Sequence, residues 1–190
     1  RPAYGRRDIA GAGAKRYEQR GIGRMWERIR TGHGYDAHRF AAGLLPNKPF
    51  VLGGISIPHD RSLLAHSDGD AVIHALCDAL LGAIGRGDIG RHFPDTDPEF
   101  SNIDSGLLLQ RVCGFLEDSD WLVGNVDITI LAQSPRMAPH IDAMCQRLSS
   151  LMNIDAQQVN VKASTTEGMG FVGRKEGIET YAVVLIYRDK

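Results

Sequence analysis

The order of strand-like and helix-like segments is the feature that most constrains how this chain can fold. From Ile29 onward, segments with the two-residue period of a strand alternate with segments that have the 3.6-residue period of a helix. The strand-like segments are residues 28–34, 50–58, 125–131, 159–163 and 178–187. Gly53-Gly54 interrupts the second of these segments, which predicts a hairpin.

Three further segments have helical periodicity. The first spans residues 70–84, and Asp68 or Asp70 is available as its N-cap. The second runs from Ser101 or Asp104 to about residue 117, and its expected inward residues are Leu107, Leu108, Val112, Phe115 and Leu116. The third is expected to open at Pro135, because proline is tolerated in a first turn. Its expected core residues are Met137, Ile141, Met144, Cys145, Leu148 and Leu151.

Strands interleaved with helices predict an α+β fold, in which helices pack on one face of a mixed sheet as a ferredoxin-like α/β sandwich. The 190 residues suffice for one substantial core, so we expect a single domain at residues 29–190. Residues 1–28 form a basic extension. They fit a contact or targeting segment, but we favour a flexible arm, a linker or the remnant of a fusion partner or transit segment.

Composition excludes several classes of protein. A net charge of −1 gives no support to nucleic acid binding. No apolar run approaches the ~20 residues that a membrane-spanning helix needs, so we expect no membrane association. The three cysteines are far apart and fit reduced core residues of a cytosol-like compartment; they are Cys77, Cys113 and Cys145.

Asp36, His38 and His74 predict a metal site. Residues two apart at a strand end project from the same side, so Asp36 and His38 are expected to lie side by side. His74 would join them from the first turns of the following helix. One carboxylate and two imidazoles suit zinc or a similar divalent ion, and three protein ligands leave one tetrahedral position open for substrate. The alternative is that both histidines are ordinary surface or core residues.

The segment His66-Ser67-Asp68-Gly69-Asp70 stands where a helix begins. Backbone N–H groups and the positive end of the helix dipole can hold an anion there, and phosphate is the expected one. The alternative is a capped helix entry with no ligand.

Four other turn-rich segments could contact a ligand, although each also fits a plain connection. Residues 88–97 could form a lid over a polyol, and residues 132–137 could read a polar edge of a ligand. Residues 164–168 offer hydroxyls and a carboxylate that suit phosphate oxygens and Mg²⁺. Residues 170–174 offer an aromatic ring and Arg174, whose guanidinium could hold phosphate with two hydrogen bonds.

Together these motifs resemble the family of 2-C-methyl-D-erythritol 2,4-cyclodiphosphate synthases of the non-mevalonate isoprenoid pathway. The resemblance runs from about Ile29 to the C-terminus. It rests on Gly32-His33-Gly34-Tyr35-Asp36-Ala37-His38, Leu64-Ala65-His66-Ser67-Asp68-Gly69-Asp70, Gly87-Asp88-Ile89-Gly90, Phe93-Pro94-Asp95-Thr96-Asp97, Gly124-Asn125-Val126-Asp127 and Asn160-Val161-Lys162-Ala163. Two positions depart from the family pattern: Ser164 stands where threonine is frequent, and Ser134 where a small apolar residue is common.

The resemblance implies a role for each site residue. Zinc would be held by Asp36, His38 and His74, while Glu167 would hold Mg²⁺ or Mn²⁺ with the substrate diphosphate. His66 and Thr165 would stabilise the transition state. The contacts implied for the methylerythritol phosphate are Asp88, Gly90 and, in the loop from Phe93 to Asp97, Phe93, Asp95 and Asp97. Asp36, His38, His66 and Ser67 are implied substrate contacts as well. Those implied for the cytidine are Ala132, Pro135, Arg136, Met137, Ala138, Ala163, Ser164 and Thr165. Further implied substrate contacts are Thr166, Glu167, Phe171 and Arg174.

The reaction that the resemblance implies is a metal-assisted cyclisation. The 2-phosphate of 4-diphosphocytidyl-2-C-methyl-D-erythritol 2-phosphate would attack the β-phosphorus and expel CMP, so the enzyme would be a cyclising phosphorus–oxygen lyase. The family implies a homotrimer with sites at subunit interfaces and with an isoprenoid diphosphate as a ligand of the trimer axis. It also implies a bacterial cytoplasm, or a plastid or apicoplast if the N-terminal segment is a transit remnant.

Two other functions fit the same residues. A zinc phosphohydrolase would use water at the open metal position and release a linear phosphate. A binding protein would keep a structural zinc and hold cytidine nucleotides or an isoprenoid diphosphate without reaction. The second alternative requires a closed site with four protein ligands, whereas the sequence offers three in one neighbourhood.

Overall fold

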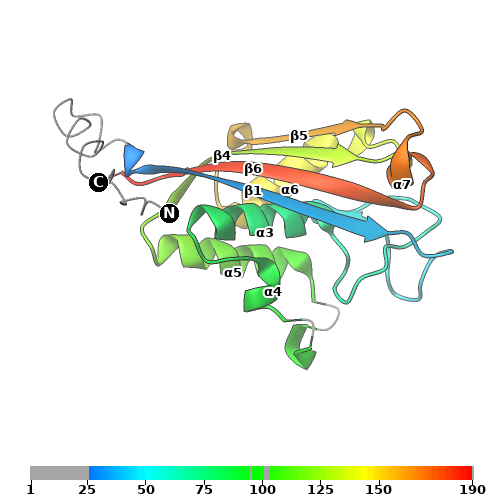
Figure 1. Ribbon diagram of the computed structural model, residues 1–190, viewed down its shortest axis with the longest axis horizontal. Helices are drawn as coiled ribbons and strands as arrows, with labels where there is room; N and C mark the ends of the chain where they lie inside the picture. The colour runs from blue at the N-terminus through cyan, green and yellow to red at the C-terminus, as the bar shows by residue number, and fades with distance from the viewer. Residues whose placement is uncertain (1–25, 95, 101–102, 190) are drawn as a thin grey trace, which may run out of the picture.

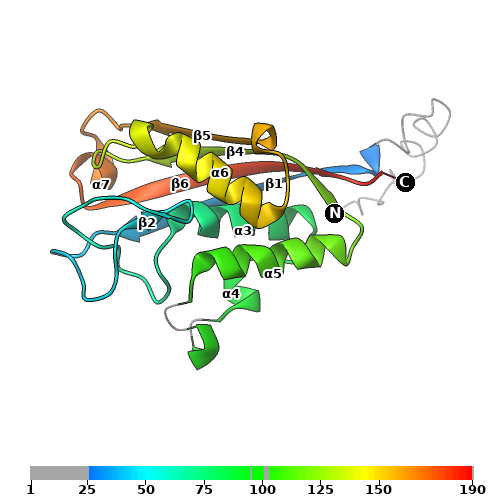
Figure 2. The ribbon, with the colours of Figure 1, turned by 180° about the vertical axis from the view of Figure 1, so that it is seen from behind.

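The computed structural model describes residues 26–94, 96–100 and 103–189. A four-stranded sheet with helices on one of its faces forms most of it, and a short two-stranded hairpin is separate (Figures 1 and 2). The four-stranded sheet has the order β1-β6-β4-β5. Its strands are β1 (Ile29–Arg39), β4 (Leu122–Leu131), β5 (Val159–Ser164) and β6 (Gly177–Tyr187). β4 and β5 are parallel and the other two pairs are antiparallel, so the sheet is mixed. The predicted mixed α+β class is confirmed.

Three long helices cover one face of this sheet. They are α3 (Ala71–Ala83), α5 (Ser105–Glu117) and α6 (Ile141–Met152). α3 lies against β1 and β6 and is enclosed by α5 on its other side, whereas α6 packs on β5. The remaining elements are short: β2 (Val51–Leu52), β3 (Ile55–Ser56), α4 (Ile89–His92), η1 (Pro98–Phe100), η2 (Ala138–His140), η3 (Ala156–Gln158) and α7 (Gly170–Gly173). Among the described residues, no helix is long and apolar enough to cross a membrane.

The ferredoxin-like part of the prediction is wrong. A ferredoxin-like chain follows the order β-α-β-β-α-β, whereas here all of α3, α4 and α5 separate β1 from β4, and two strands follow α6. The crossover through α6 makes β4 and β5 parallel neighbours at one edge. The last strand, β6, then fills the position between β1 and β4.

Most strands and helices lie where the periodicity predicts them, and the largest differences are at the end of β1 and the start of α6. β1 extends to Arg39, five residues beyond its predicted end. The helix expected to open at Pro135 begins at Ile141, because Pro139 of the 3-10 turn η2, rather than Pro135, stands at the start of the helical region.

The predicted core positions are largely correct. Val126, Ile128 and Ile130 of β4 are buried toward the helices, as the alternation predicts. Leu107 is an exception, because its side chain is 50% exposed while Leu109 is fully buried. Leu108, Val112 and Leu116 are buried as predicted, so the inward face of α5 follows the predicted stripe and includes Leu109 in place of Leu107.

Two glycines of β1 allow α3 to pack directly on the strand backbone. A Cβ atom at Gly32 would lie 1.8 Å from the carbonyl oxygen of Ala79, and one at Gly34 would lie 1.9 Å from that of Ala75. Neither distance is physically possible, so any side chain at these positions would push the helix away from the strand. This close approach determines how near the first turn of α3 comes to the end of β1.

Asp70 connects the start of α3 to the β2–β3 hairpin. Its carboxylate accepts hydrogen bonds from the backbone N–H groups of Val72 and Ile73, which makes it the N-cap of the helix. It also accepts from Gly53 and Gly54, the two residues of the hairpin turn, at 2.8 and 2.6 Å. Both glycines have positive φ, as a two-residue hairpin turn often requires, so the predicted hairpin is confirmed.

Replacing Asp70 with alanine is expected to lower the free energy of unfolding by about 4 kcal/mol, because four backbone donors lose a buried carboxylate partner. Asp104 is a matched control: it caps α5 but is exposed, and its side chain accepts only from Gly106. For Asp104→Ala the expected loss is about 1 kcal/mol. Urea unfolding of both variants measures the difference, and equal losses would show that the hairpin connection contributes nothing.

Candidate metal centre

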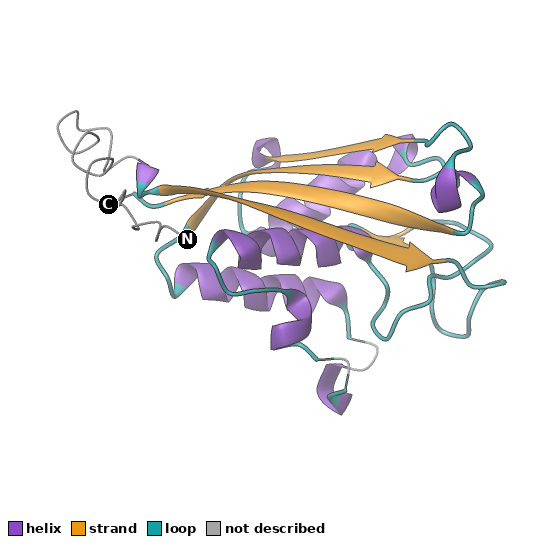
Figure 3. Ribbon diagram, in the orientation of Figure 1, coloured by secondary structure: helices purple, strands orange, loops and turns teal. Residues whose placement is uncertain are grey.

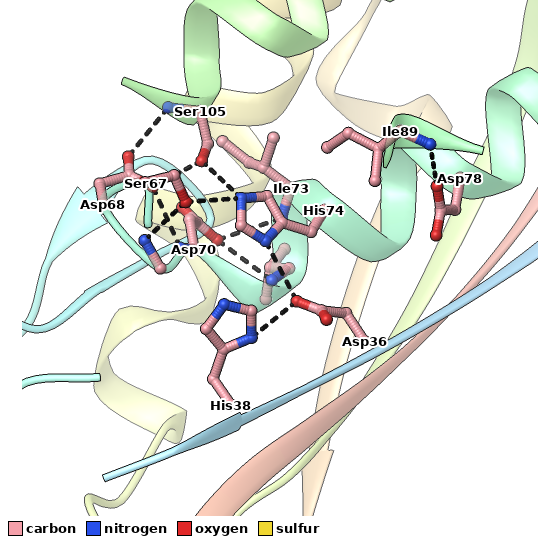
Figure 4. Close-up of polar contacts among 12 residues, drawn as sticks. Asp36, His38, Ser67, Asp68, Asp70, Ile73, His74, Asp78, Ile89 and Ser105 are labelled. Carbon is pink, nitrogen blue, oxygen red and sulfur yellow. Dashed lines mark hydrogen bonds and ion pairs between the residues drawn. The ribbon is translucent and has the colours of Figure 1, made fainter. Parts of the chain in front are cut away.

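Asp36, His38 and His74 converge in the structure as the sequence predicts (Figure 4). One nitrogen or oxygen atom from each side chain lies within 4.8 Å of the corresponding atoms of the other two. Asp36 Oδ2 is 2.9 Å from His38 Nδ1 and 3.2 Å from His74 Nδ1. The three residues therefore form a compact group that can hold a metal ion.

The backbone explains this convergence. Gly32, Gly34, Asp36 and His38 alternate along β1 and share the face that α3 covers. Because α3 packs directly on the two glycines, its first turn lies next to Asp36 and His38, the following residues on the same face of β1. His74 lies in that turn, next to the residue whose carbonyl contacts Gly34, and its ring reaches Asp36.

The electrostatics of the group favour a negative carboxylate. Burial alone would raise the pKa of Asp36, but the contacts with His38 and His74 outweigh it and hold the pKa at about 2. Burial would likewise lower the pKa of His74, yet the hydrogen bond and charge of Asp36 leave that pKa raised. Asp36 and His74 thus stabilise each other's charged forms in a largely buried place.

These residues fit a divalent transition metal. His38 Nδ1 is buried and lacks a hydrogen-bond partner of acceptable geometry, although it lies close to Asp36, so a metal ion would satisfy it. A carboxylate with two imidazoles is a frequent donor set for zinc. Within the described part of the chain, the group contains three potential ligands and no fourth, so a bound ion would keep an open position.

A cavity of about 260 Å³ adjoins this group. His66, Ser67, Gly90 and Phe93, four residues predicted to contact the substrate, line it. The complete lining is Asp36, His38, Ala65, His66, Ser67, His74, Ile89, Gly90, Phe93, Phe100, Ile103 and Leu108. A ligand that enters this cavity would therefore meet the open side of the metal group.

Other predicted contacts do not line this cavity. Asp88 caps α4 by accepting from Arg91 N, and Asp97 accepts from Glu99 N. Asp95 lies outside the described residues, so its predicted contact stays a prediction. The segment 88–93 is attached to α3 by one hydrogen bond, in which Asp78 Oδ1 accepts from Ile89 N at 2.7 Å.

Sequence reasoning missed the apolar wall of the cavity and two buried hydroxyls near the metal group. The wall is Ile89, Phe100, Ile103 and Leu108. Ser105 is fully buried and contacts the ring of His74. Thr180 is fully buried, is paired with Asp36 in the β1–β6 register, and its hydroxyl has no partner. Helical periodicity marks Leu108 as an inward residue, but no local pattern marks the contacts that these residues make, because each contact joins distant segments.

A second cavity, of about 430 Å³, contains the residues predicted for the cytidine pocket. It lies where β4 and β5 end, since the backbone N–H of Ala132 donates to the carbonyl oxygen of Ser164 and keeps the two segments together. The lining residues are Ala132, Gln133, Ser134, Pro135, Arg136, Met137, Ala138, Ile141, Ala163, Ser164 and Thr165. The structure thus brings this predicted group together, and its ligand stays a prediction.

The remaining predicted residues follow β5 and continue into α7. Thr165 Oγ1 donates to Glu167 Oε1 at 2.8 Å, and Thr166 Oγ1 donates to Met169 O. Phe171 lies in α7, and Arg174 pairs with Glu176 at 2.8 Å on the surface. Of these residues, only Thr165 lines either of the two cavities.

The metal group and the second cavity lie at the same end of the sheet but at opposite edges. β1, β4 and β5 run in one direction, so their C-terminal ends share one end of the sheet (Figure 3). β1 and β5 are nevertheless the two edge strands. Three strand spacings of about 4.8 Å separate them by about 14 Å. Among the described residues, the two cavities share no lining residue.

Comparison with known proteins identifies the family. A sequence profile of the YgbB family matches residues 29–187. The 2-C-methyl-D-erythritol 2,4-cyclodiphosphate synthase of Pseudomonas putida (strain W619) is 56% identical over 83% of this chain and 98% of its own length. Similarity at this level over nearly a whole relative shows membership of the same family.

Solved structures agree. The bifunctional IspDF from Campylobacter jejuni matches with a TM-score of 0.79 and 41% identity over 84% of this chain, which spans 42% of that longer protein. The CDP complex of IspF from Plasmodium falciparum matches with a TM-score of 0.75 and 34% identity over 86% of this chain and 98% of its own. The chain therefore belongs to the YgbB family, among whose members are the 2-C-methyl-D-erythritol 2,4-cyclodiphosphate synthases of isoprenoid biosynthesis.

Proposed function

We propose that this chain converts 4-diphosphocytidyl-2-C-methyl-D-erythritol 2-phosphate to 2-C-methyl-D-erythritol 2,4-cyclodiphosphate and releases CMP. The observation that carries this proposal is the group Asp36, His38 and His74, which opens toward a cavity lined by His66 and Ser67. Relatives with this activity in their names share more than half of the residues, and two related structures are CDP complexes.

The reaction needs no oxidant and no covalent enzyme intermediate. An oxygen of the 2-phosphate forms a bond to the β-phosphorus, and the bond from this phosphorus to the bridging oxygen breaks, so that CMP leaves with that oxygen. Both reacting groups are anions, so binding geometry and neutralisation of charge supply most of the acceleration. A site whose hydrogen-bond donors and metal ligands are held in place by the fold can supply both effects.

Residues of the chain bind and orient the substrate. Asp36, His38 and His74 would hold zinc, which supplies Lewis-acid stabilisation of phosphate charge when bound. His66 and Thr165 would stabilise the transition state, and Glu167 would hold Mg²⁺ beside the diphosphate. The apolar wall of the cavity, including Phe93 and Phe100, would exclude water and so favour ring closure over hydrolysis.

The separation of the two half-sites supports a homotrimer. One substrate molecule must contact both the metal group and the cytidine pocket, yet these lie at opposite edges of the sheet in one chain. A neighbouring subunit would supply the second half. The sheet face turned away from the helices carries exposed apolar side chains that a partner would cover: Tyr35, Leu122 and Val183 are 43–46% exposed.

Product analysis tests the reaction. Purified protein incubated with the cytidyl substrate, Zn²⁺ and Mg²⁺ is expected to form the cyclic diphosphate and CMP in equal amounts, as detected by mass spectrometry. Release of a linear phosphate instead would show a zinc phosphohydrolase. Substrate that binds and stays intact would show a binding protein.

Mixing two inactive variants tests the shared site. His74→Ala removes a ligand of the metal group, and Glu167→Ala removes the proposed Mg²⁺ ligand that follows β5. Each variant alone is expected to be inactive. If subunits exchange freely, about a quarter of the sites in a one-to-one mixture combine two intact halves from neighbouring chains. Recovery of about a quarter of the wild-type activity is expected, and a mixture as inactive as its components would place both halves in one subunit.

A further inference from the structure

His74 contacts a second set of groups on the side of its ring that faces away from Asp36 (Figure 4). Its Nε2 lies 2.9 Å from Ser105 Oγ and 3.2 Å from Ser67 Oγ. Ser105 is fully buried, and its hydroxyl donates a hydrogen bond to Asp68 Oδ1 at 2.5 Å. The contacts thus run in a line from Asp68 through Ser105 to His74 and on to Asp36.

The direction of these hydrogen bonds follows from what each group can donate. Asp68 accepts from the hydroxyl of Ser105, from Ser105 N and from Asp70 N, which is the pattern of a carboxylate that only accepts. The single hydroxyl proton of Ser105 is therefore directed at Asp68. Toward His74, Ser105 Oγ can only accept, so Nε2 must carry the ring proton.

We propose that Ser105 and Asp68 are positioning residues that hold a proton of His74 on Nε2, so that Nδ1, the ring nitrogen beside Asp36, is the one that binds a metal ion. The proposal rests on the metal role proposed for the group. It assigns a function to two residues that lie outside the metal-ligand set. Ser67 Oγ also lies near His74 Nε2, and because its hydroxyl is free to rotate it can accept from Nε2–H in addition to accepting from Gly69 N.

Helix capping alone does not account for this arrangement. Asp104 already caps α5, and the backbone N–H of Ser105 reaches Asp68 without any help from the Ser105 hydroxyl. The hydroxyl is the atom that joins the Asp68 carboxylate to the imidazole. A ligand histidine whose other nitrogen is bound in this way has a fixed ring orientation and a fixed tautomer.

Zinc affinity tests the proposal without substrate. Competition with a chelator is expected to show that Ser105→Ala binds Zn²⁺ about 10–100-fold more weakly than the wild type. Ser149→Ala is the matched control, because Ser149 is also a buried helical serine, but its hydroxyl donates to Gln146 O away from the metal group. The control is expected to bind zinc as the wild type does. A folded Ser105→Ala protein with wild-type zinc affinity would overturn the proposal.

The tautomer can also be read in the wild-type protein, so the test does not depend on a variant that folds. Long-range ¹⁵N–¹H NMR correlations of the histidine rings in the zinc-loaded protein are expected to show the proton of His74 on Nε2. A proton on Nδ1 would overturn the proposal. Neither readout uses the cytidyl substrate. A result in which Ser105 and Asp68 do not position His74 can therefore be told apart from a result in which the protein does not catalyse the proposed reaction.

Discussion

His74→Ala is expected to remove bound zinc and to lower the rate of cyclisation by about a thousandfold or more, equivalent to about 4 kcal/mol of transition-state stabilisation. The reason is that His74 supplies one of the three potential ligands and also fixes the carboxylate of Asp36 at 3.2 Å. With two ligands left, the remaining pair cannot hold the ion at its working position. Zinc content measured by mass spectrometry and single-turnover rates of CMP release check both effects on the same sample.

His140→Ala serves as the control for this substitution. His140 precedes α6, makes no capping hydrogen bond and lines neither of the two cavities. It is expected to keep its zinc and its rate within twofold or so of the wild type, as surface substitutions usually do. A zinc-free His74→Ala protein that turns over at the wild-type rate would show that the metal group has no part in the reaction.

Gly34→Ala is expected to destabilise the protein by about 3 kcal/mol or more and to weaken zinc binding at the same time. A methyl group at this position would lie 1.9 Å from the carbonyl oxygen of Ala75, so α3 must move outward from β1. Because His74 lies next to Ala75, the same displacement increases its distance from Asp36. Denaturant unfolding and chelator competition measure the two consequences separately.

Gly82→Ala, in the helix that packs on Gly34, is expected to change stability in the opposite direction. Gly82 lies in α3, is exposed, and a Cβ atom there would meet no other atom within 4 Å. Alanine is therefore expected to stabilise the helix by about 0.5–1 kcal/mol and to leave zinc affinity unchanged. If both substitutions changed stability alike, close packing of α3 on β1 would not be the cause of the Gly34 effect.

The metal group could be predicted from sequence because local rules place its members. Asp36 and His38 need only the two-residue period of a strand, and His74 needs only the start of a helix that Asp70 caps. The residues of the second cavity were grouped only by the family resemblance, and the structure places them after the ends of two strands that the periodicity predicts. For the metal group alone, local structure is enough to indicate which side chains share an end of the sheet.

Other features depend on contacts between distant segments and were not predictable in the same way. The position of β6 between β1 and β4 separates the metal group from the second cavity, and no sequence period specifies strand order. The contact of Ser105 with His74 joins α5 to α3, 31 residues apart. The predicted start of α6 at Pro135 is wrong because two prolines, Pro135 and Pro139, fit a first helical turn, and the sequence pattern does not distinguish them.

Anomalous diffraction at the zinc edge tests the central claim most directly. Crystals grown with zinc are expected to show one strong peak at about 2.0–2.2 Å from Asp36, His38 and His74, with the fourth position occupied by water or a phosphate oxygen. A peak elsewhere in the protein, or a fourth protein ligand that closes the site, would contradict the account.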